Sequence, residues 1–488
     1  MDRKQRIAAR NISAMKRRLE SGDTSGRTLN DRLAGKGIPA ADRESFLDWA
    51  VEYLWTSFKE ERMNQRLIIE NEIRGRGIRF PNGTVKKDYE TRFSLPLDRI
   101  SGISLEGAEE LGLNLTVNES GESLLSGRPT KAGDFTLRLR YSTLEGEPIS
   151  ELAVPIAFNP NPRDLWKNIP TDLGIPYYKE DSESAYIRVE GSADNYPRKN
   201  MLAASQRGRS HAQEGRPRDD HFSLFHCDES DWYILSVADG AGSARYSRKG
   251  SEVACATVID YCKSRLLDNP EFNQVIADFQ ADRDNEERRV RMTRHVIDIV
   301  LGAARKAHEA VNRLAEVNER EEVRPKDFAT TLMFAICRKF EFGWFIASFW
   351  VGDGAIALYD AENKSIKLLG TPDEGEFSGQ TRFLTMPEIF RDKDVVSKRM
   401  RISIVPDFTA LFLMTDGISD PMFETERNLS DYSRWEAFYN RLREGFPEDG
   451  IGGVDLSSDN PASQEQLLSW LDFWSPGNHD DRTIALLY

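Results

Sequence analysis

Three apolar runs in the second half of the chain each end at an aspartate that is followed by glycine. They occupy residues 232–240, 345–354 and 411–417. Each run has the length and apolar character of a buried strand, and each stops at a carboxylate beside a residue that is free to turn. A single Asp-Gly after a strand usually marks only a turn. Three of them in one block call for a common explanation.

Two acidic pairs, Asp219-Asp220 and Asp480-Asp481, lie beside apolar segments near the two ends of the same block. Carboxylates that gather at strand ends repel one another unless a cation lies between them. A ligand set made only of oxygens selects hard divalent ions such as Mg²⁺ or Mn²⁺. The sequence therefore predicts a carboxylate-rich site for two metal ions.

The motifs that contain these residues resemble, in the same order, those of the metal-dependent Ser/Thr protein phosphatases of type 2C, bacterial type. The opening motif is matched by Gly208-x-Ser210-His211 and by residues 215–220. The later motifs are matched by residues 237–243, 328–332, 352–354, 376–385, 415–417 and 480–483. The resemblance spans about residues 205–488, which is one whole catalytic domain.

This resemblance implies a fold, a cofactor and a ligand set. The fold would be a β-sandwich flanked by helices, with the site at one edge. Asp239 would bridge two Mn²⁺ or Mg²⁺ ions, and the Gly240 carbonyl would bind one of them. The set would be completed by Asp220, Asp416 and Asp480 for the two ions, and by Asp353 with Asp416 for a third. Such ions activate water for phosphomonoester hydrolysis, so the resemblance gives Asp220, Asp239, Asp416 and Asp480 catalytic roles.

Two positions depart from the family pattern. Ala241 stands where many members carry a histidine proposed as the general acid, and His211 and His479 are the nearby candidates, although structural roles are favoured for both. The usual phosphate-binding arginine falls at Gly215, so Arg209, Arg216 or Arg218 would have to substitute for it. We predict Arg216 and Arg218 as its substitutes, because strand alternation would send both to the side of Asp220. Asp481 replaces the usual asparagine.

The preceding elements divide the chain into further regions. Residues 1–78 read as helical, with Phe46, Trp49, Tyr53, Leu54 and Phe58 at near-helical spacing. Basic residues between Arg3 and Arg18 favour a solvated helix face. The expected domains are the helical region 1–78, an immunoglobulin-like β-sandwich at 79–160, a linker at 161–176 and the phosphatase-like block 177–488.

The sandwich prediction rests on period-two alternation over residues 135–141 and on surrounding turn signals. Residues 125–137 also resemble the turn-and-strand signature of immunoglobulin-like domains in bacterial proteins. The linker prediction rests on the prolines of the segment 159–162. We therefore expect a multi-domain protein, with an N-terminal α-helical region, a small all-β immunoglobulin-like domain and a C-terminal α/β phosphatase domain.

Composition narrows the function classes. The 488 residues contain 66 Lys and Arg against 80 Asp and Glu, for a net charge of −14. An acidic chain argues against a nucleic-acid binder, and no apolar run is long enough to span a bilayer. No secretory signal precedes the first helix. Four cysteines without paired spacing indicate a reducing compartment, so we expect a cytoplasmic protein.

The resemblance also implies partners, namely a phosphorylated protein substrate and a cognate Ser/Thr kinase or its targets. The alternative is a catalytically weak phosphatase fold that acts as a phosphoprotein-binding or scaffold module. Ala241 and the displaced arginine motivate that alternative. Retention of the metal carboxylates speaks against it.

Overall fold

The computed structural model of the chain describes residues 34–488 apart from 38, 144–147, 194–195, 319–321, 374–380 and 458–459. The basic residues between Arg3 and Arg18 and the first half of the motif 376–385 lie outside the described residues. The chain divides into two compact units, Met1–Leu165 and Trp166–Tyr488. In the described part of the chain, no helix has both the length and the apolar character that a membrane crossing requires.

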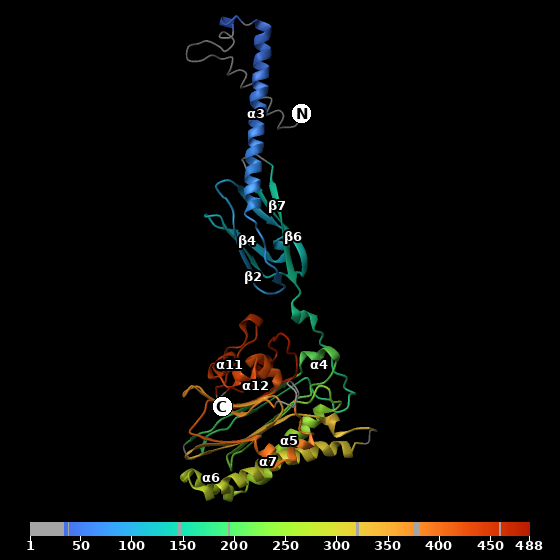
Figure 1. Cartoon of the computed structure of the whole chain (residues 1–488), viewed down its shortest axis with the longest axis vertical. Coiled ribbons are helices and arrows are strands. Elements are labelled where there is room, and N and C mark those ends of the chain that lie inside the picture. Colours follow the sequence, from blue (N-terminus) through green and yellow to red (C-terminus); the bar gives the residue numbers. More distant parts are fainter. Residues whose placement is uncertain are drawn as a thin grey trace. The chain divides into compact units, whose positions relative to one another are not determined.

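The first unit combines one long helix with two small sheets (Figure 1). The helix is α3, Ala40–Gly75. The strands are β1 Gly83–Thr84, β2 Tyr89–Ser94, β3 Ser101–Glu106, β4 Leu113–Val117, β5 Glu122–Gly127, β6 Gly133–Ser142 and β7 Ser150–Asn159. Their orders are β1-β7-β6-β3 and β2-β5-β4.

One apolar core joins these two sheets. Leu137, Leu139 and Tyr141 of β6 alternate with exposed or half-buried residues, which confirms the period-two alternation predicted for this strand. Ile69 and Ile73 near the end of α3 pack into the same core. The immunoglobulin-like assignment of the region stays a prediction.

The second unit contains two large antiparallel sheets and a two-stranded sheet of β9 and β10. The strands are β8 Ser182–Ile187, β9 Ser192–Ala193, β10 Tyr196–Pro197, β11 Met201–Gln206, β12 His221–Cys227, β13 Trp232–Ala238, β14 Leu332–Phe340, β15 Gly343–Val351, β16 Ala355–Asp360, β17 Ser365–Gly370, β18 Met400–Val405, β19 Ala410–Met414 and β20 Arg482–Leu487. The large sheets have the orders β17-β16-β19-β20-β11-β8 and β12-β13-β14-β15-β18. The three apolar runs that end in Asp-Gly are β13, β15 and β19, so all three are strands as predicted.

Helices cover the outer face of each large sheet. They are α4 Arg209–Glu214, α5 Ser247–Leu266, α6 Pro270–Ala281, α7 Glu286–Glu316, α8 Lys393–Ser397, α9 Asp416–Phe423, α10 Glu426–Leu429, α11 Tyr432–Glu444 and α12 Ser463–Leu471. One core lies between the five-stranded sheet and α5, α6 and α7, and another lies between the six-stranded sheet and α9, α11 and α12. A third core fills the space between the sheets. The unit is therefore a β-sandwich between two helical layers (Figure 1).

Part of the predicted linker 161–176 packs on the second unit. The Arg207 guanidinium donates to Asn168 Oδ1 at 2.6 Å and to the Ile169 carbonyl at 3.2 Å. It also pairs with Asp181 at 3.1 Å. The side chain of Arg207 is only 2% exposed, so its guanidinium needs the segment from Trp166 onward to supply hydrogen-bond acceptors. This segment is therefore part of the second unit.

Candidate metal centre

Antiparallel pairing brings the acidic motifs to one edge of the sandwich. His221 pairs with Ala238 where β12 begins and β13 ends, so the preceding Asp219-Asp220 lies beside Asp239. Met414 pairs with Ile484 in β19 and β20, which places Asp416 near Asp480-Asp481. Gln206 pairs with Arg482 in β11 and β20, which brings the first acidic pair to the last, and the Asp219 amide donates to Asp481 Oδ2. Distant motifs meet because a strand end lies beside the start of its antiparallel neighbour.

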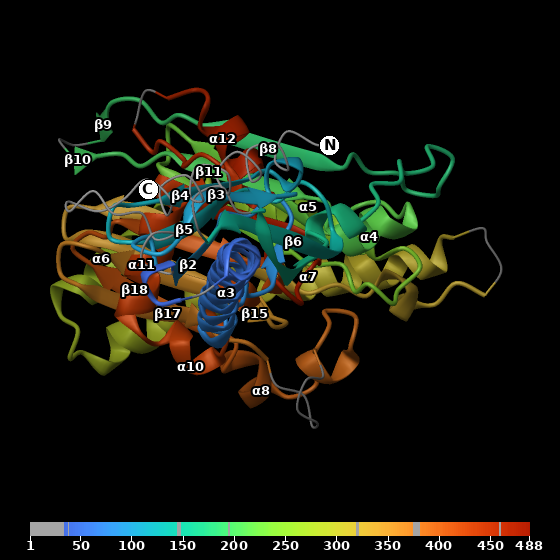
Figure 2. The same cartoon turned by 90° about the horizontal axis from the view of Figure 1, so that it is seen from above.

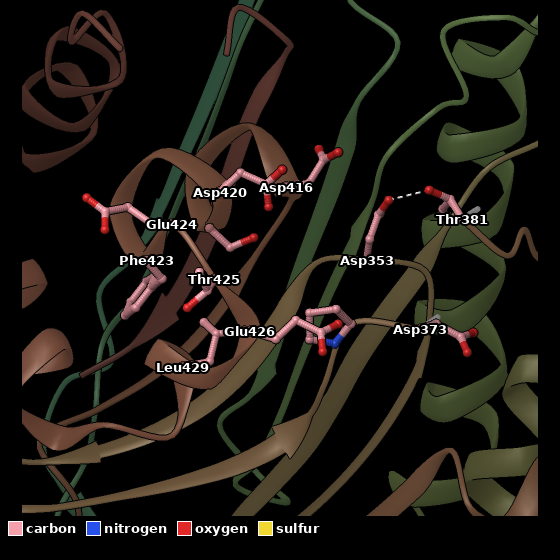
Figure 3. Close-up of a pocket in the computed structure, with 12 residues that line it drawn as sticks. Asp353, Asp373, Thr381, Asp416, Asp420, Phe423, Glu424, Thr425, Glu426 and Leu429 are labelled. Carbon is pink, nitrogen blue, oxygen red and sulfur yellow. Dashed lines mark hydrogen bonds between the residues drawn. The ribbon is translucent and has the colours of Figure 1, made fainter. Parts of the chain in front are cut away.

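Asp239, Asp353 and Asp416 form the centre of the cluster. Each offers a carboxylate oxygen, and these three atoms lie within 4.8 Å of one another. Hydrogen bonds orient the surrounding backbone, since Thr331 Oγ1 accepts from the Asp239 amide at 2.8 Å and the Thr331 amide donates to the Asp239 carbonyl at 2.7 Å. Thr381 Oγ1 donates to Asp353 Oδ2 (Figure 3).

The electrostatics of this cluster favour a bound cation. Burial and then the charges of Asp220, Asp416, Asp480 and Asp353 raise the pKa of Asp239 well above its usual value. Burial and then the charges of Asp353, Asp480, Asp220 and Asp420 do so for the pKa of Asp416. Among the described residues, the buried atoms Asp353 Oδ1 and Asp416 Oδ1 have no hydrogen-bond partner. Buried, crowded and unpartnered oxygens of this kind fit hard divalent ions.

Asp220 lies next to this centre and is buried. It accepts a hydrogen bond from Thr415 Oγ1 at 3.0 Å. Burial, followed by the charges of Asp481 and Asp480, raises its pKa to about 7. The charge of Asp220 in turn raises the pKa of Asp239 and of Asp416, so these three carboxylates lie close enough to repel one another.

A second group, formed by His211, Asp219 and Asp481, holds the motif segments together. Asp481 accepts from the amides of Gly208 and Asp219, both at 2.6 Å, and contacts His211 Nδ1 at 3.0 Å. Burial opposes protonation of His211, but the charges of Asp481 and Asp219 outweigh it and raise the pKa of His211 to about 9. The charged imidazole of His211 therefore lies between the buried carboxylates of Asp219 and Asp481 and stabilises both.

This geometry bears on the two histidines named as candidate acids. His211 is 4% exposed, and its Nε2 lies 3.8 Å from Asp219 Oδ2. His479 lies between Trp166 and Trp474, at ring distances of 4.3 and 5.1 Å, and burial with Arg209 and Arg482 nearby lowers its pKa. Both surroundings correspond to the structural roles that were favoured for them.

The two predicted phosphate-binding arginines take different places. Arg216 donates to the Gly242 carbonyl at 2.7 Å and to Asp219 Oδ2 at 3.2 Å, and 34% of its side chain is exposed. Arg218 is 1% exposed and pairs with Glu183 at 2.8 Å. The expected alternation does not apply, because β12 begins only at His221 and residues 216–220 are not a strand. The structure leaves Arg216 at the site and turns Arg218 away from it.

The glycines after the aspartates serve close packing rather than turning. Neither Gly240 nor Gly417 has a positive φ, so neither position needs the conformational freedom of glycine for a turn. A Cβ on Gly417 would lie 1.9 Å from the Asp481 carbonyl oxygen, and one on Gly240 would lie 2.6 Å from the Asp219 carbonyl oxygen. The motif segments can approach each other only where these side chains are missing.

Gly417→Ala should therefore disturb both stability and the site. The new methyl must displace the 480–481 segment, and overpacking of this kind costs about 1–3 kcal/mol. We expect a lower midpoint in urea unfolding and a loss of activity. Gly452→Ala is the matched control, because no atom lies within 4 Å of a Cβ at that position. Equal midpoints for the two variants would contradict this close-approach account.

A cavity of about 580 Å³ opens beside the cluster and reaches from Asp353 and Asp416 to α9 and α10 (Figure 3). Its lining includes Asp420 and, among the residues that the structure describes, carries no lysine, arginine or histidine. Asp420 was not predicted as a site residue, although its place one helical turn after Asp416 puts both on one face of α9. Burial, with the charges of Asp353 and Asp480, raises the pKa of Asp420.

Residues 207–471 match the protein phosphatase 2C family. The catalytic domain of the serine threonine protein phosphatase PstP in complex with two manganese ions is 15% identical, and the match covers 59% of this chain and 97% of that chain with a TM-score of 0.32. The Mycobacterium tuberculosis serine/threonine phosphatase PstP/Ppp is 15% identical over 60% and 98%, with a TM-score of 0.33. The S. agalactiae serine/threonine phosphatase is 12% identical over 63% and 99%, with a TM-score of 0.34. A comparison with curated proteins finds no match.

Proposed function

Because the chain belongs to the protein phosphatase 2C family, we propose that it is a metal-dependent phosphatase of phosphoserine and phosphothreonine in proteins. The observation that carries this proposal is the convergence of Asp239, Asp353 and Asp416, with unpartnered oxygens on two of them. A purely structural cluster would neutralise these oxygens with basic side chains or hydrogen-bond donors.

We propose that Asp220, Asp239, Asp416, Asp480 and the Gly240 carbonyl hold two Mn²⁺ or Mg²⁺ ions, with Asp353 and Asp416 available to a third. When bound, such ions lower the pKa of water and neutralise charge on phosphoryl oxygens. The chain itself contributes the fixed carboxylates, the buried surroundings and the Thr330 and Thr331 contacts that hold the Asp239 backbone. Ala241 supplies no proton, and His211 is engaged with Asp481 and Asp219, so the leaving alkoxide takes its proton from another donor.

The substrate and its setting belong to the same proposal. The cavity beside the carboxylates is open to solvent, and cations held there would offset its acidic lining for a phosphorylated side chain on a protein. The source of that substrate would be a cognate Ser/Thr kinase or its targets. All four cysteines lie in the described part of the chain and are free thiols. Free thiols support a reducing compartment, so we place the substrate in the cytoplasm.

The experiment that tests the function is phosphate release from a phosphoserine or phosphothreonine peptide by the full chain in Mn²⁺. We expect turnover, with little release from a phosphotyrosine peptide. The scaffold alternative predicts binding of the phosphopeptide without turnover, which fluorescence anisotropy would detect. Binding with no phosphate release in either Mn²⁺ or Mg²⁺ would favour that alternative.

Arg216→Ala should raise KM for an aryl phosphate at least several-fold, because its partly exposed guanidinium has N–H donors beyond those that bind Gly242 and Asp219 and can offer them to a phosphoryl group. Metal content should not change. Arg218→Ala is the comparison, since its guanidinium is buried against Glu183 and should affect stability rather than KM. A KM unchanged in Arg216→Ala would remove this residue from substrate binding.

A further inference from the structure

The helix α3 exposes an unusual number of large apolar side chains. Eight of them are between 44% and 58% exposed: Phe46, Trp49, Tyr53, Leu54, Phe58, Met63, Leu67 and Ile68. Figure 1 shows the N-terminal half of α3 extending past the strands of its own unit, and Figure 2 views this helix nearly end-on. Contiguous exposed apolar surface of this kind marks an interaction site.

Six of these residues lie on one face, within about 140° around the helix at 3.6 residues per turn. We name them the α3 stripe: Phe46, Trp49, Tyr53, Met63, Leu67 and Ile68. Five of them follow a heptad in which 46, 53, 60 and 67 are a positions and 49, 56, 63 and 70 are d positions. This spacing is that of a coiled-coil seam. Phe58 lies on the opposite side of the helix from Trp49.

We propose that α3 pairs through this stripe with α3 of a second copy of the chain, in antiparallel orientation. The inference is independent of the proposed function. The occupant is a second copy because the polar residues of the seam are placed for self-pairing, and because the stripe offers enough area for it.

Three seam positions are polar, Thr56, Glu60 and Glu70, and the two at the centre decide the orientation. Parallel pairing would stack Glu60 on Glu60 of the second copy inside the seam, which is costly for unpaired carboxylates. Antiparallel pairing places Glu60 opposite Thr56 at the centre. The same register places Tyr53 opposite Met63 and Trp49 opposite Leu67, so that apolar layers lie on both sides of the polar one.

The flanking charges suit the same register. In an antiparallel pair the g positions face each other, so Glu52 lies opposite Arg66 of the second copy, twice in the dimer. Arg66 already pairs with Glu70 of its own helix at 2.9 Å and can share its guanidinium between two carboxylates. Lys59 would face Lys59 of the second copy at the solvent-exposed centre of the helix pair, where repulsion between the two ammonium groups is small.

The area is sufficient for a stable dimer. A covered aromatic side chain buries about 150–250 Å². At the exposures observed, the six residues of the α3 stripe would bury about 600 Å² on each helix, or about 1,200 Å² in total, which reaches the range of specific interfaces.

The first test is the mass of the full chain in solution, by light scattering after gel filtration. We expect twice the mass of one chain, and a monomer for the variant Trp49→Asp with Leu67→Asp. Phe58→Asp is the matched control, because it also replaces an exposed aromatic residue of α3 but on the opposite face. A monomeric full chain, or dissociation by Phe58→Asp alone, would overturn the proposal.

The second test is cross-linking by disulfides in a Cys227→Ser background, since the other three cysteines are buried. Tyr53→Cys with Met63→Cys should give a covalent dimer. Tyr53→Cys alone should not, because antiparallel copies of residue 53 are about 15 Å apart along the axis. Efficient cross-linking by the single variant would show parallel pairing and overturn the register. Dimerisation only after removal of residues 1–33 would show instead that this segment covers the stripe.

Discussion

Asp239→Asn is expected to lower phosphate release by at least about 10³-fold, which corresponds to roughly 4 kcal/mol of transition-state stabilisation. Burial and the charges of four neighbouring aspartates raise the pKa of Asp239, so it lies among their negative charges. Asparagine keeps the size of the side chain but loses the charge and one acceptor oxygen. We expect fewer bound Mn²⁺ ions per chain as well as lower kcat.

Three measurements separate this effect from unfolding. Circular dichroism should show an unchanged fold, because removing one of several crowded carboxylates relieves repulsion in the metal-free protein. Metal counting should show the loss of Mn²⁺ directly. Asp284→Asn is the control, since Asp284 is exposed in the loop before α7 and its charge lies outside the cluster. Turnover near that of the control would mean that Asp239 is not the central ligand.

Removing divalent ions with EDTA is expected to abolish turnover and to lower the melting temperature, more at pH 7.5 than at pH 5. Burial and neighbouring carboxylates raise the pKa of Asp220 to about 7 and that of Asp219 to about 6. The folded metal-free protein therefore binds more protons than the unfolded chain between about pH 4 and pH 7. Since groups with a raised folded pKa lose their stabilising contribution as the pH rises, metal-free stability should fall across this window.

Each carboxyl group contributes up to about 1.4 kcal/mol for every pH unit in that window. Bound cations cancel the repulsion, so the difference in melting temperature between Mn²⁺ and EDTA should widen from pH 5 to pH 7.5. Calorimetry at both pH values, followed by re-addition of Mn²⁺ and an activity assay, measures this. Activity that survives EDTA, or a difference in melting temperature that is constant with pH, would contradict a metal centre at these carboxylates.

Local sequence determined the elements that carry the site. Strands β13, β15 and β19 were predictable because long apolar runs of this kind must be buried, and an aspartate is the residue at which such a run can end. The alternation in β6 was equally readable. The order of the motifs along the chain indicated the protein phosphatase 2C family, to which residues 207–471 belong.

Only the tertiary structure decided which side chains meet and which way they face. Arg218 was expected beside Asp220, but the segment 216–220 is not a strand, so alternation could not predict its pairing with Glu183. The charged pair of His211 and Asp481 joins two residues that are 270 positions apart in the sequence. Gly417 was interpreted as a turn residue, whereas its missing side chain admits the Asp481 carbonyl. Sequence patterns report the periodicity of one segment, while a hydrogen bond, an ion pair or a close approach is set by the packing of two.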